Sequence, residues 1–193
     1  MLEQRIQQQF FDAADLKYQS AEALSKPIAD AAQAIVGALT AGGKLLAAGL
    51  GPSAALASMF AARLMGRFER ERPGLAALAL RADGAALTEG MESSLARQVA
   101  TLGSPGDLLL LVDTDGEHPA ILAAARAAHA NEMAVIALVG RSGGALRAAL
   151  GETDAVVGVP HDNGARVLEV HLLMLHCLCD TIDLQLLGEQ DLS

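Results

Sequence analysis

After residue 43 the chain is patterned as short, unbroken apolar runs separated by longer stretches with helical spacing. The five runs, each with Gly or Pro next to at least one end, span 44–50, 74–80, 107–112, 133–139 and 154–159. They lack the alternation of a half-solvated strand, which is typical of strands buried on both faces of a parallel sheet. Helices are expected over about 52–67, 85–101, 118–130, 143–150 and 165–187. The pattern predicts an α/β fold with three αβα layers around a parallel sheet of five strands.

The first forty residues have a helical periodicity instead. Apolar residues recur at steps of three and four from Leu2 to Ala14, and again from Ile28 to Leu39. Pro27 suits the first turn of a helix, and Gly42-Gly43 would end one. We therefore predict two helices in this segment.

The composition excludes several classes of function. The chain has 193 residues, a length that suits one domain. Its 14 Lys and Arg against 23 Asp and Glu leave a net charge of −9, which argues against binding to duplex nucleic acid or to an anionic membrane. No run of 18 apolar residues and no secretory signal pattern occur, so a cytoplasmic location with reduced Cys177 and Cys179 is expected.

Two segments follow predicted strands at the edge of the sheet where ligands of open α/β folds bind. Residues 49–54 read Gly-Leu-Gly-Pro-Ser-Ala, and residues 113–118 read Asp-Thr-Asp-Gly-Glu-His. Glycines allow a tight turn and a close approach of the backbone to a ligand, and hydroxyl groups donate to it. The predicted ligand-binding residues are Gly49, Gly51, Ser53, Asp113, Thr114, Asp115, Gly116 and His118.

Each segment also has other interpretations. The first matches the dinucleotide fingerprint G-x-G-x-x-A, but Arg81 stands where a ribose-binding acid is expected. Its structural alternative is a tight turn, with Ser53 capping the next helix. The second resembles the D-x-D motif of haloacid-dehalogenase phosphatases, yet no Lys follows Lys44 to hold a phosphate. A metal site formed by the acidic residues and His118, or a solvated loop shaped by Asp and Gly, are its alternatives.

The last predicted helix carries an apolar stripe and a second, polar stripe that includes Glu169 and His176. These two residues lie on the same face because seven residues make about two helical turns. Histidine titrates near neutral pH, so His176 is a candidate general acid or base. The alternative is a hydrogen-bonded histidine that only packs.

Taken in order, these pieces resemble the sugar isomerase (SIS) domain family, in particular the branch of bacterial phosphoheptose isomerases and DiaA, the DnaA initiator-associating protein. Residues 49–55 are similar to the family's G-N-G-x-S-A turn, residues 67–73 to its R-F-E-x-E-R-P segment, and residues 165–171 to A-R-I-Q-E-x-H. Residues 176–183 look most like the DiaA branch. The resemblance implies one SIS domain over 1–193, with a helical oligomerisation segment at 1–42, an αβα core with the C-terminal helix at 43–193, and a homotetramer.

The resemblance also implies catalytic and zinc-binding residues, and the residues of this sequence can be compared with them position by position. The isomerases convert sedoheptulose 7-phosphate with a carboxylate and a His, commonly with Zn²⁺. Their H-F-x-x-E pattern falls on Met59 and Arg63, and their Gln falls on Leu168. Arg reverses the charge of a carboxylate, so these positions do not support zinc, and no cofactor is expected. The family's catalytic positions correspond to Arg63, Glu169 and His176, and none of them is assigned a catalytic role.

The family's phosphate loop, S-T-S-G-N-S, corresponds to residues 113–118, whose three carboxylates would repel a phosphate dianion by ~1–4 kcal/mol per close pair.

From the loss of the base, the zinc ligands and the phosphate loop we predict a non-catalytic protein similar to DiaA, which binds DnaA as a homotetramer and regulates replication initiation. Leu186 and Leu187 would contact DnaA; the alternative is that they pack on the subunit or its neighbour. The alternative functions are a sedoheptulose 7-phosphate isomerase with His176 or Glu169 as a relocated base, and a non-catalytic sugar-phosphate-binding module.

Overall fold

The computed structural model describes residues 1–81 and 90–188, and in this part of the chain five parallel strands form one sheet in the order β2-β1-β3-β4-β5. Each strand lies within one of the predicted apolar runs. The strands are β1 (Leu45–Gly49), β2 (Ala77–Ala79), β3 (Leu108–Val112), β4 (Ala134–Val139) and β5 (Ala155–Gly158). The predicted α/β class and five-stranded parallel sheet are confirmed.

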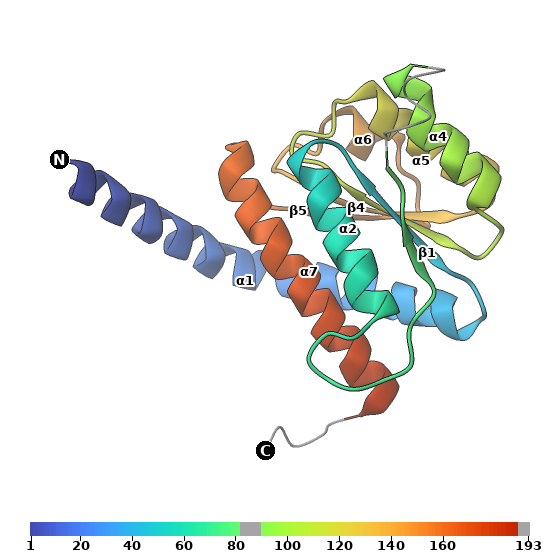
Figure 1. Cartoon of the computed structure of the whole chain (residues 1–193). Coiled ribbons are helices and arrows are strands. Elements are labelled where there is room, and N and C mark those ends of the chain that lie inside the picture. Colours follow the sequence, from blue (N-terminus) through green and yellow to red (C-terminus); the bar gives the residue numbers. More distant parts are fainter. Residues whose placement is uncertain (82–89, 189–193) are drawn as a thin grey trace.

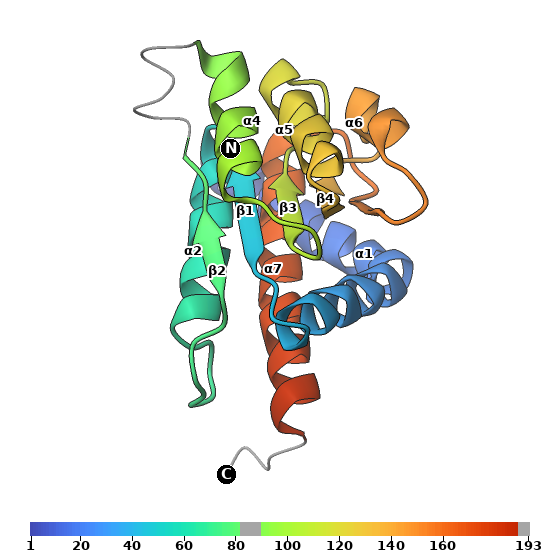
Figure 2. The same cartoon turned by 90° about the vertical axis from the view of Figure 1, so that its right-hand side faces the viewer.

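Helices cover both faces of the sheet and make the outer two layers (Figures 1 and 2). One face packs against α1 (Leu2–Thr40), α2 (Pro52–Met65) and α7 (Gly164–Leu187), and the other against α4 (Met91–Leu102), α5 (Pro119–Ala130) and α6 (Gly144–Ala149). Alternate strand residues enter the two cores: Leu45 joins the first, and Leu46 the second. No helix in the described ranges combines the length and apolar character needed to cross a bilayer.

A single helix, α1, occupies the segment where we predicted two helices, so that prediction was wrong. Pro27 lies inside α1. An internal proline removes one helical hydrogen bond and costs about 3 kcal/mol. The turns that follow it bury Ala31, Ala32 and Ile35 completely, and this packing holds the helix together across the proline.

The first third of α1 projects away from the rest of the molecule (Figure 1). The side chains of Leu2, Ile6, Phe10 and Phe11 are each more than half exposed there. An isolated helix of this length is marginal in water, because helical stability in proteins comes mostly from packing of an apolar face. The projecting part of α1 therefore presents apolar side chains without a partner within the described part of the chain.

The buried His171 of α7 should make the stability of the fold depend on pH. Its Nε2–H group donates to the Val139 carbonyl oxygen at 3.2 Å, and burial lowers the pKa of His171 from 6.5 to about 4. The unfolded chain therefore binds a proton that the folded chain does not bind between pH 6.5 and about 4. The stabilisation from neutral His171 is complete above pH 6.5 and is lost as the pH falls toward 4, by on the order of 2–3 kcal/mol.

Urea unfolding at a series of pH values tests this expectation. In His171→Asn the side chain keeps a donor for Val139 but does not titrate. The free energy of unfolding of the wild type should fall more steeply below pH 6.5 than that of the variant. Equal slopes in the two proteins would contradict it.

Candidate active site

The two predicted ligand-binding segments lie next to each other at the carboxyl ends of β1 and β3. Gly49, the last residue of β1, pairs with Val112, the last residue of β3. The turn at 49–54 and the loop at 113–118 leave the sheet from these neighbouring positions. The sheet register therefore brings both segments to one edge, where ligands of parallel α/β folds bind.

The turn after β1 requires its two glycines. A Cβ atom on Gly49 would lie 2.7 Å from the backbone of Ser53 and 2.9 Å from the Val112 carbonyl oxygen, and Gly51 has a φ of +53°. The expectation that Ser53 caps the next helix is wrong: the cap position is Gly51, Pro52 fills the first helical turn, and no side chain bonds the end of α2. Ser53 is instead a buried residue inside the helix.

The carboxylates of the loop at 113–118 accept hydrogen bonds from backbone N–H groups. Asp113 accepts from Gly116 at 3.0 Å, Asp115 accepts from Glu117 at 2.9 Å, and Glu117 accepts from Ala145 at 3.1 Å. Asp115 and Glu117 are exposed, but Asp113 is buried, so the expectation of a solvated loop fails for Asp113. Burial, with a smaller contribution from the neighbouring Asp115, raises the pKa of the Asp113 carboxyl.

Removing one charge from this loop should tighten phosphate binding. We expect Asp115→Ser to increase the affinity for a sugar phosphate about tenfold, since one like-charge contact near a surface costs roughly 1 kcal/mol or more. Isothermal titration of wild type and variant with sedoheptulose 7-phosphate measures the change. Glu152→Gln is the matched control: it removes one exposed charge just before β5, at the opposite edge of the sheet. An equal gain in both variants, or none in either, would contradict a local effect of Asp115.

Thr114 and His118 have different roles in the same loop. The Thr114 carbonyl oxygen accepts from the Gly140 N–H at 3.0 Å, and the Thr114 side chain lies beside Gly164 at the start of α7. The His118 ring accepts from the Ala120 N–H through Nδ1 at 3.2 Å and thereby caps α5. The Thr114 hydroxyl forms no hydrogen bond within residues 1–81 and 90–188, whereas Nδ1 of His118 is already used.

A second group of candidate residues lies where the end of α2 meets α7. We call Arg63, Phe68 and His176 the α2–α7 cluster. The Phe68 and His176 ring centroids are 5.5 Å apart, with an angle of 33° between the rings, and the guanidinium carbon of Arg63 lies 5.7 Å from the Phe68 centroid. The sequence motifs contained all three residues, but nothing in their spacing indicated that they meet.

The two groups of residues are separated along α2. Arg63 is ten residues after Ser53 on α2, or about 15 Å along the helix axis. Glu169 of α7 belongs to neither group. It is ion-paired with Arg166 at 2.8 Å, and Arg166 also donates hydrogen bonds to Gln9 of α1. Glu169 is therefore engaged in holding α1 and α7 together.

The residues at the family's zinc positions do not fit a zinc ion. Zinc takes nitrogen, sulfur or carboxylate ligands, three or four of them from the protein. Met59 and Arg63, one helical turn apart on α2, supply a thioether and a cation, and Leu168 supplies no donor. In residues 1–81 and 90–188 no three His, Cys, Asp or Glu side chains are placed to share a metal. The Arg63 guanidinium, which lies over the Phe68 ring, would repel a divalent cation from its surroundings.

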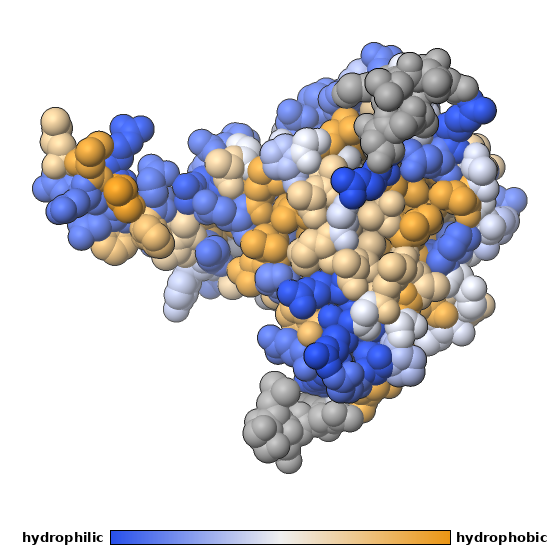
Figure 3. Space-filling model, viewed as in Figure 1, coloured by the Kyte–Doolittle hydropathy of each residue, from blue (hydrophilic) through white to orange (hydrophobic). Residues whose placement is uncertain are grey.

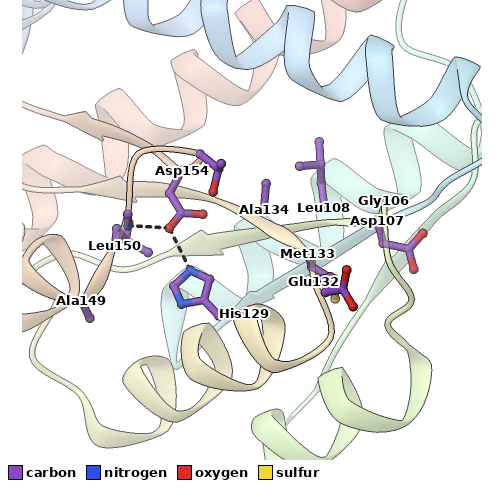
Figure 4. Close-up of a pocket in the computed structure, with 12 residues that line it drawn as sticks. Gly106, Asp107, Leu108, His129, Glu132, Met133, Ala134, Ala149, Leu150 and Asp154 are labelled. Atoms are coloured by element: carbon purple, nitrogen blue, oxygen red, sulfur yellow. Dashed lines mark hydrogen bonds and ion pairs between the residues drawn. The ribbon is translucent and has the colours of Figure 1, made fainter.

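A cleft of about 610 Å³ that the sequence analysis did not identify lies at the opposite edge of the sheet, before β3, β4 and β5 (Figure 4). Its ionisable side chains are mostly paired with protein groups: His129 contacts Asp154 at 2.8 Å, and Asp154 also accepts from the N–H groups of Val135 and Gly151. Asp107 is paired with Lys44 at 2.5 Å. These bonds join the start of the strands to the adjoining loops, which is a structural role that no sequence motif indicated.

Comparison with known proteins defines the class of protein. The model of the SIS domain family matches residues 9–140. The phosphoheptose isomerase of Methylibium petroleiphilum is 58% identical, with 100% of this chain and 99% of that protein covered, and the phosphoheptose isomerase of Aromatoleum aromaticum is 48% identical over 97% of each. The solved structure of a phosphoheptose isomerase from Francisella tularensis superposes with a TM-score of 0.91 at 41% identity, over 95% of this chain and 98% of that chain.

The fold and the turn after β1 are those of an SIS domain. More narrowly, the chain belongs to the phosphoheptose isomerase family. The prediction of a non-catalytic protein similar to DiaA that binds DnaA and regulates replication was wrong, because whole-chain identity groups this chain with isomerases. Leu186 and Leu187, predicted to contact DnaA, are both half-buried, and Leu186 packs against the core.

Proposed function

We propose that this chain is a sedoheptulose 7-phosphate isomerase, an aldose–ketose isomerase. The observation that carries the proposal is the 58% identity, over the whole chain, to a protein named phosphoheptose isomerase. The positions that differ from the family's motifs include Met59 and Arg63 of α2, Leu168 of α7 and the loop at 113–118. They change how the reaction is catalysed while the scaffold that surrounds it is retained.

The reaction requires a group that moves a proton between two neighbouring carbon atoms of the sugar. Histidine suits this task because it exchanges protons near neutral pH. His176 is half-buried, its ring packs against Phe68, and its nitrogens form no hydrogen bond within residues 1–81 and 90–188, so they are open to a substrate. Glu169 is held in its ion pair with Arg166. We therefore place the proton transfer on His176 and not on Glu169.

The proposed enzyme acts as an assembly of several copies. The exposed side chains at the start of α1 and the exposed Leu172 and Leu173 of α7 are apolar, and Figure 3 shows apolar surface over α7 and along the projecting helix. Exposed apolar patches of this kind are typical of interfaces. Light scattering should give a multiple of the 19.9 kDa chain mass, and the mass of one chain would contradict assembly.

Incubation of the purified chain with sedoheptulose 7-phosphate tests the proposed function. Product analysis should show an aldoheptose 7-phosphate, and in deuterated water the product should carry deuterium at the carbon that receives the proton. The deuterium readout detects slow turnover. Absence of both signals, with and without added zinc, would contradict the proposal.

A further inference from the structure

The α2–α7 cluster places a permanent positive charge where the family uses a metal. Arg63 and His176 each lie within 6 Å of the centroid of one ring, that of Phe68. Arg63 is exposed and His176 is half-buried, so both side chains are accessible to a molecule bound beside Phe68. A guanidinium over an aromatic face is favourable by itself, which orders the Arg63 side chain before any ligand arrives.

The backbone that carries Arg63 is fixed relative to the helix that carries His176. The Arg72 side chain donates to the Arg63 carbonyl oxygen at 3.0 Å and forms an ion pair with Asp183 of α7 at 2.5 Å. Arg72 and Asp183 are both almost completely buried, with 1% of each side chain exposed. The end of α2 and the C-terminal part of α7 are thus joined by a buried link. Groups held in place in this way stabilise developing charge without rearrangement.

We propose that the chain catalyses isomerisation without a resident divalent metal, and that Arg63 holds the sugar oxygen that becomes negatively charged. The inference rests on the proposed function. His176 takes a proton from carbon 1 of the ketose; the C–H electron pair forms the C1=C2 double bond, and the carbonyl electrons move to oxygen 2. Protonated His176 gives its proton to carbon 2 of the resulting enediolate, and the proton of oxygen 1 passes to oxygen 2 as the aldehyde forms.

This sequence of steps balances without any further reactant, because the product is an isomer of the substrate. The charge on oxygen 2 is transient, and a guanidinium offers it a permanent positive charge and two N–H donors in one plane. Arg63 would therefore bind the enediolate more strongly than the neutral carbonyl, which lowers the barrier for proton transfer.

Metal binding and activity are measured on the same preparations. Wild-type protein dialysed against a chelator should keep its kcat, and titration with zinc should show no stoichiometric binding. Met59→His/Arg63→Glu restores the imidazole and the carboxylate of the family's pattern one turn apart on α2, and should gain zinc binding. Stoichiometric zinc in the wild type, or activity that a chelator removes and zinc restores, would overturn the inference.

The role of Arg63 has its own variant. Arg63→Gln should lower kcat about 10²-fold with a smaller change in KM, as expected for loss of a group that stabilises a developing oxyanion. Arg67→Gln is the matched control, since Arg67 is an exposed arginine paired with Glu71, and should leave kcat unchanged. A loss confined to KM would show that Arg63 only binds the substrate and would overturn its proposed part in the reaction.

Failure of this inference can be told apart from failure of the proposed function. A wild type that turns over only with zinc is an isomerase with a metal, which contradicts the inference alone. A wild type that gives no product and no deuterium incorporation under either condition contradicts the proposed function, and with it the role of Arg63 in the reaction. The zinc titrations of wild type and double variant are read independently of turnover.

Discussion

Arg72→Met is expected to destabilise the folded chain by about 3–5 kcal/mol, the usual cost of removing one partner from a buried ion pair. The Arg72 Nε and Asp183 Oδ1 atoms are 2.5 Å apart, and each side chain is 1% exposed. The other Asp183 oxygen is buried with no hydrogen-bond partner in the described part of the chain. Without Arg72 the carboxylate would be left charged and unpaired, or would have to take up a proton.

Arg72 also accounts for the shape of the segment after α2. Its guanidinium donates to the carbonyl oxygens of Arg63, Leu64, Gly66 and Pro73, so one side chain satisfies the end of the helix and the loop that leaves it. These carbonyl groups would lose the Arg72 donor together with the ion pair, and only that of Leu64 would keep another donor among the residues described, the Leu75 N–H. The loop carries Phe68, so the α2–α7 cluster should loosen as well.

Urea unfolding at one fixed protein concentration measures the effect, since stability of an assembly depends on concentration. Arg67→Met is the control: its partner Glu71 is exposed, and exposed pairs contribute about 0–1 kcal/mol. Arg72→Met/Asp183→Leu should regain much of the lost stability because no charge is left buried. Equal midpoints for Arg72→Met and Arg67→Met would contradict the buried pair as a main contributor.

The class of fold could be predicted because the five strands are unbroken apolar runs, and only burial on both faces makes such runs favourable. The continuity of α1 could not be predicted in the same way. Pro27 is a local signal to begin a helix, and it is overridden by the burial of Ile35 and its neighbours, which depends on tertiary packing. Local signals decide a helix boundary only where packing does not oppose them.

The site was predictable where the sheet register determines it. Gly49 and Val112 end neighbouring strands, so the two loops that follow them must meet. The link between Arg72 and Asp183 spans 111 positions in the sequence, and the contact of Phe68 with His176 joins two elements with no common motif. Such contacts depend on how α2 and α7 lie on the sheet, and a residue pattern does not contain that information.

Replaced motif positions alone predict the wrong function for this chain. Arg63 and Asp113 indicate the loss of a base and of a phosphate loop when they are considered without the rest of the sequence. A replaced ligand shows that the family's metal or base is absent at that position, but another cation can stabilise the same charge and another base can move the same proton. The identity to isomerases over the whole chain, together with the place of Arg63 beside Phe68 and His176, favours replacement over loss.

His176→Ala is expected to lower kcat for sedoheptulose 7-phosphate by about 10³-fold, within the range for loss of a general acid or base. The physical reason is that Arg63 and Phe68 of the α2–α7 cluster cannot act as a base, and Asp180, one helical turn further along α7, lies 3.9 Å from the Arg70 guanidinium. The proton transfer, not substrate binding, should be affected, and KM should change little. Addition of free imidazole to the variant should restore part of the activity, since a small base can enter the space left beside Phe68.

Glu169→Gln separates the two candidate bases in the same assay. Because Glu169 is paired with Arg166, its substitution should weaken the contact of α7 with α1 and leave kcat within a few-fold of wild type. If Glu169→Gln loses most of its kcat while His176→Ala stays active, Glu169 is the residue that transfers the proton. That result would contradict the assignment to His176. Deuterium incorporation decides between these outcomes even at low turnover. A variant that has lost its base exchanges no proton at carbon 1 or carbon 2. A variant that only binds the substrate poorly still exchanges these protons at saturating substrate concentration.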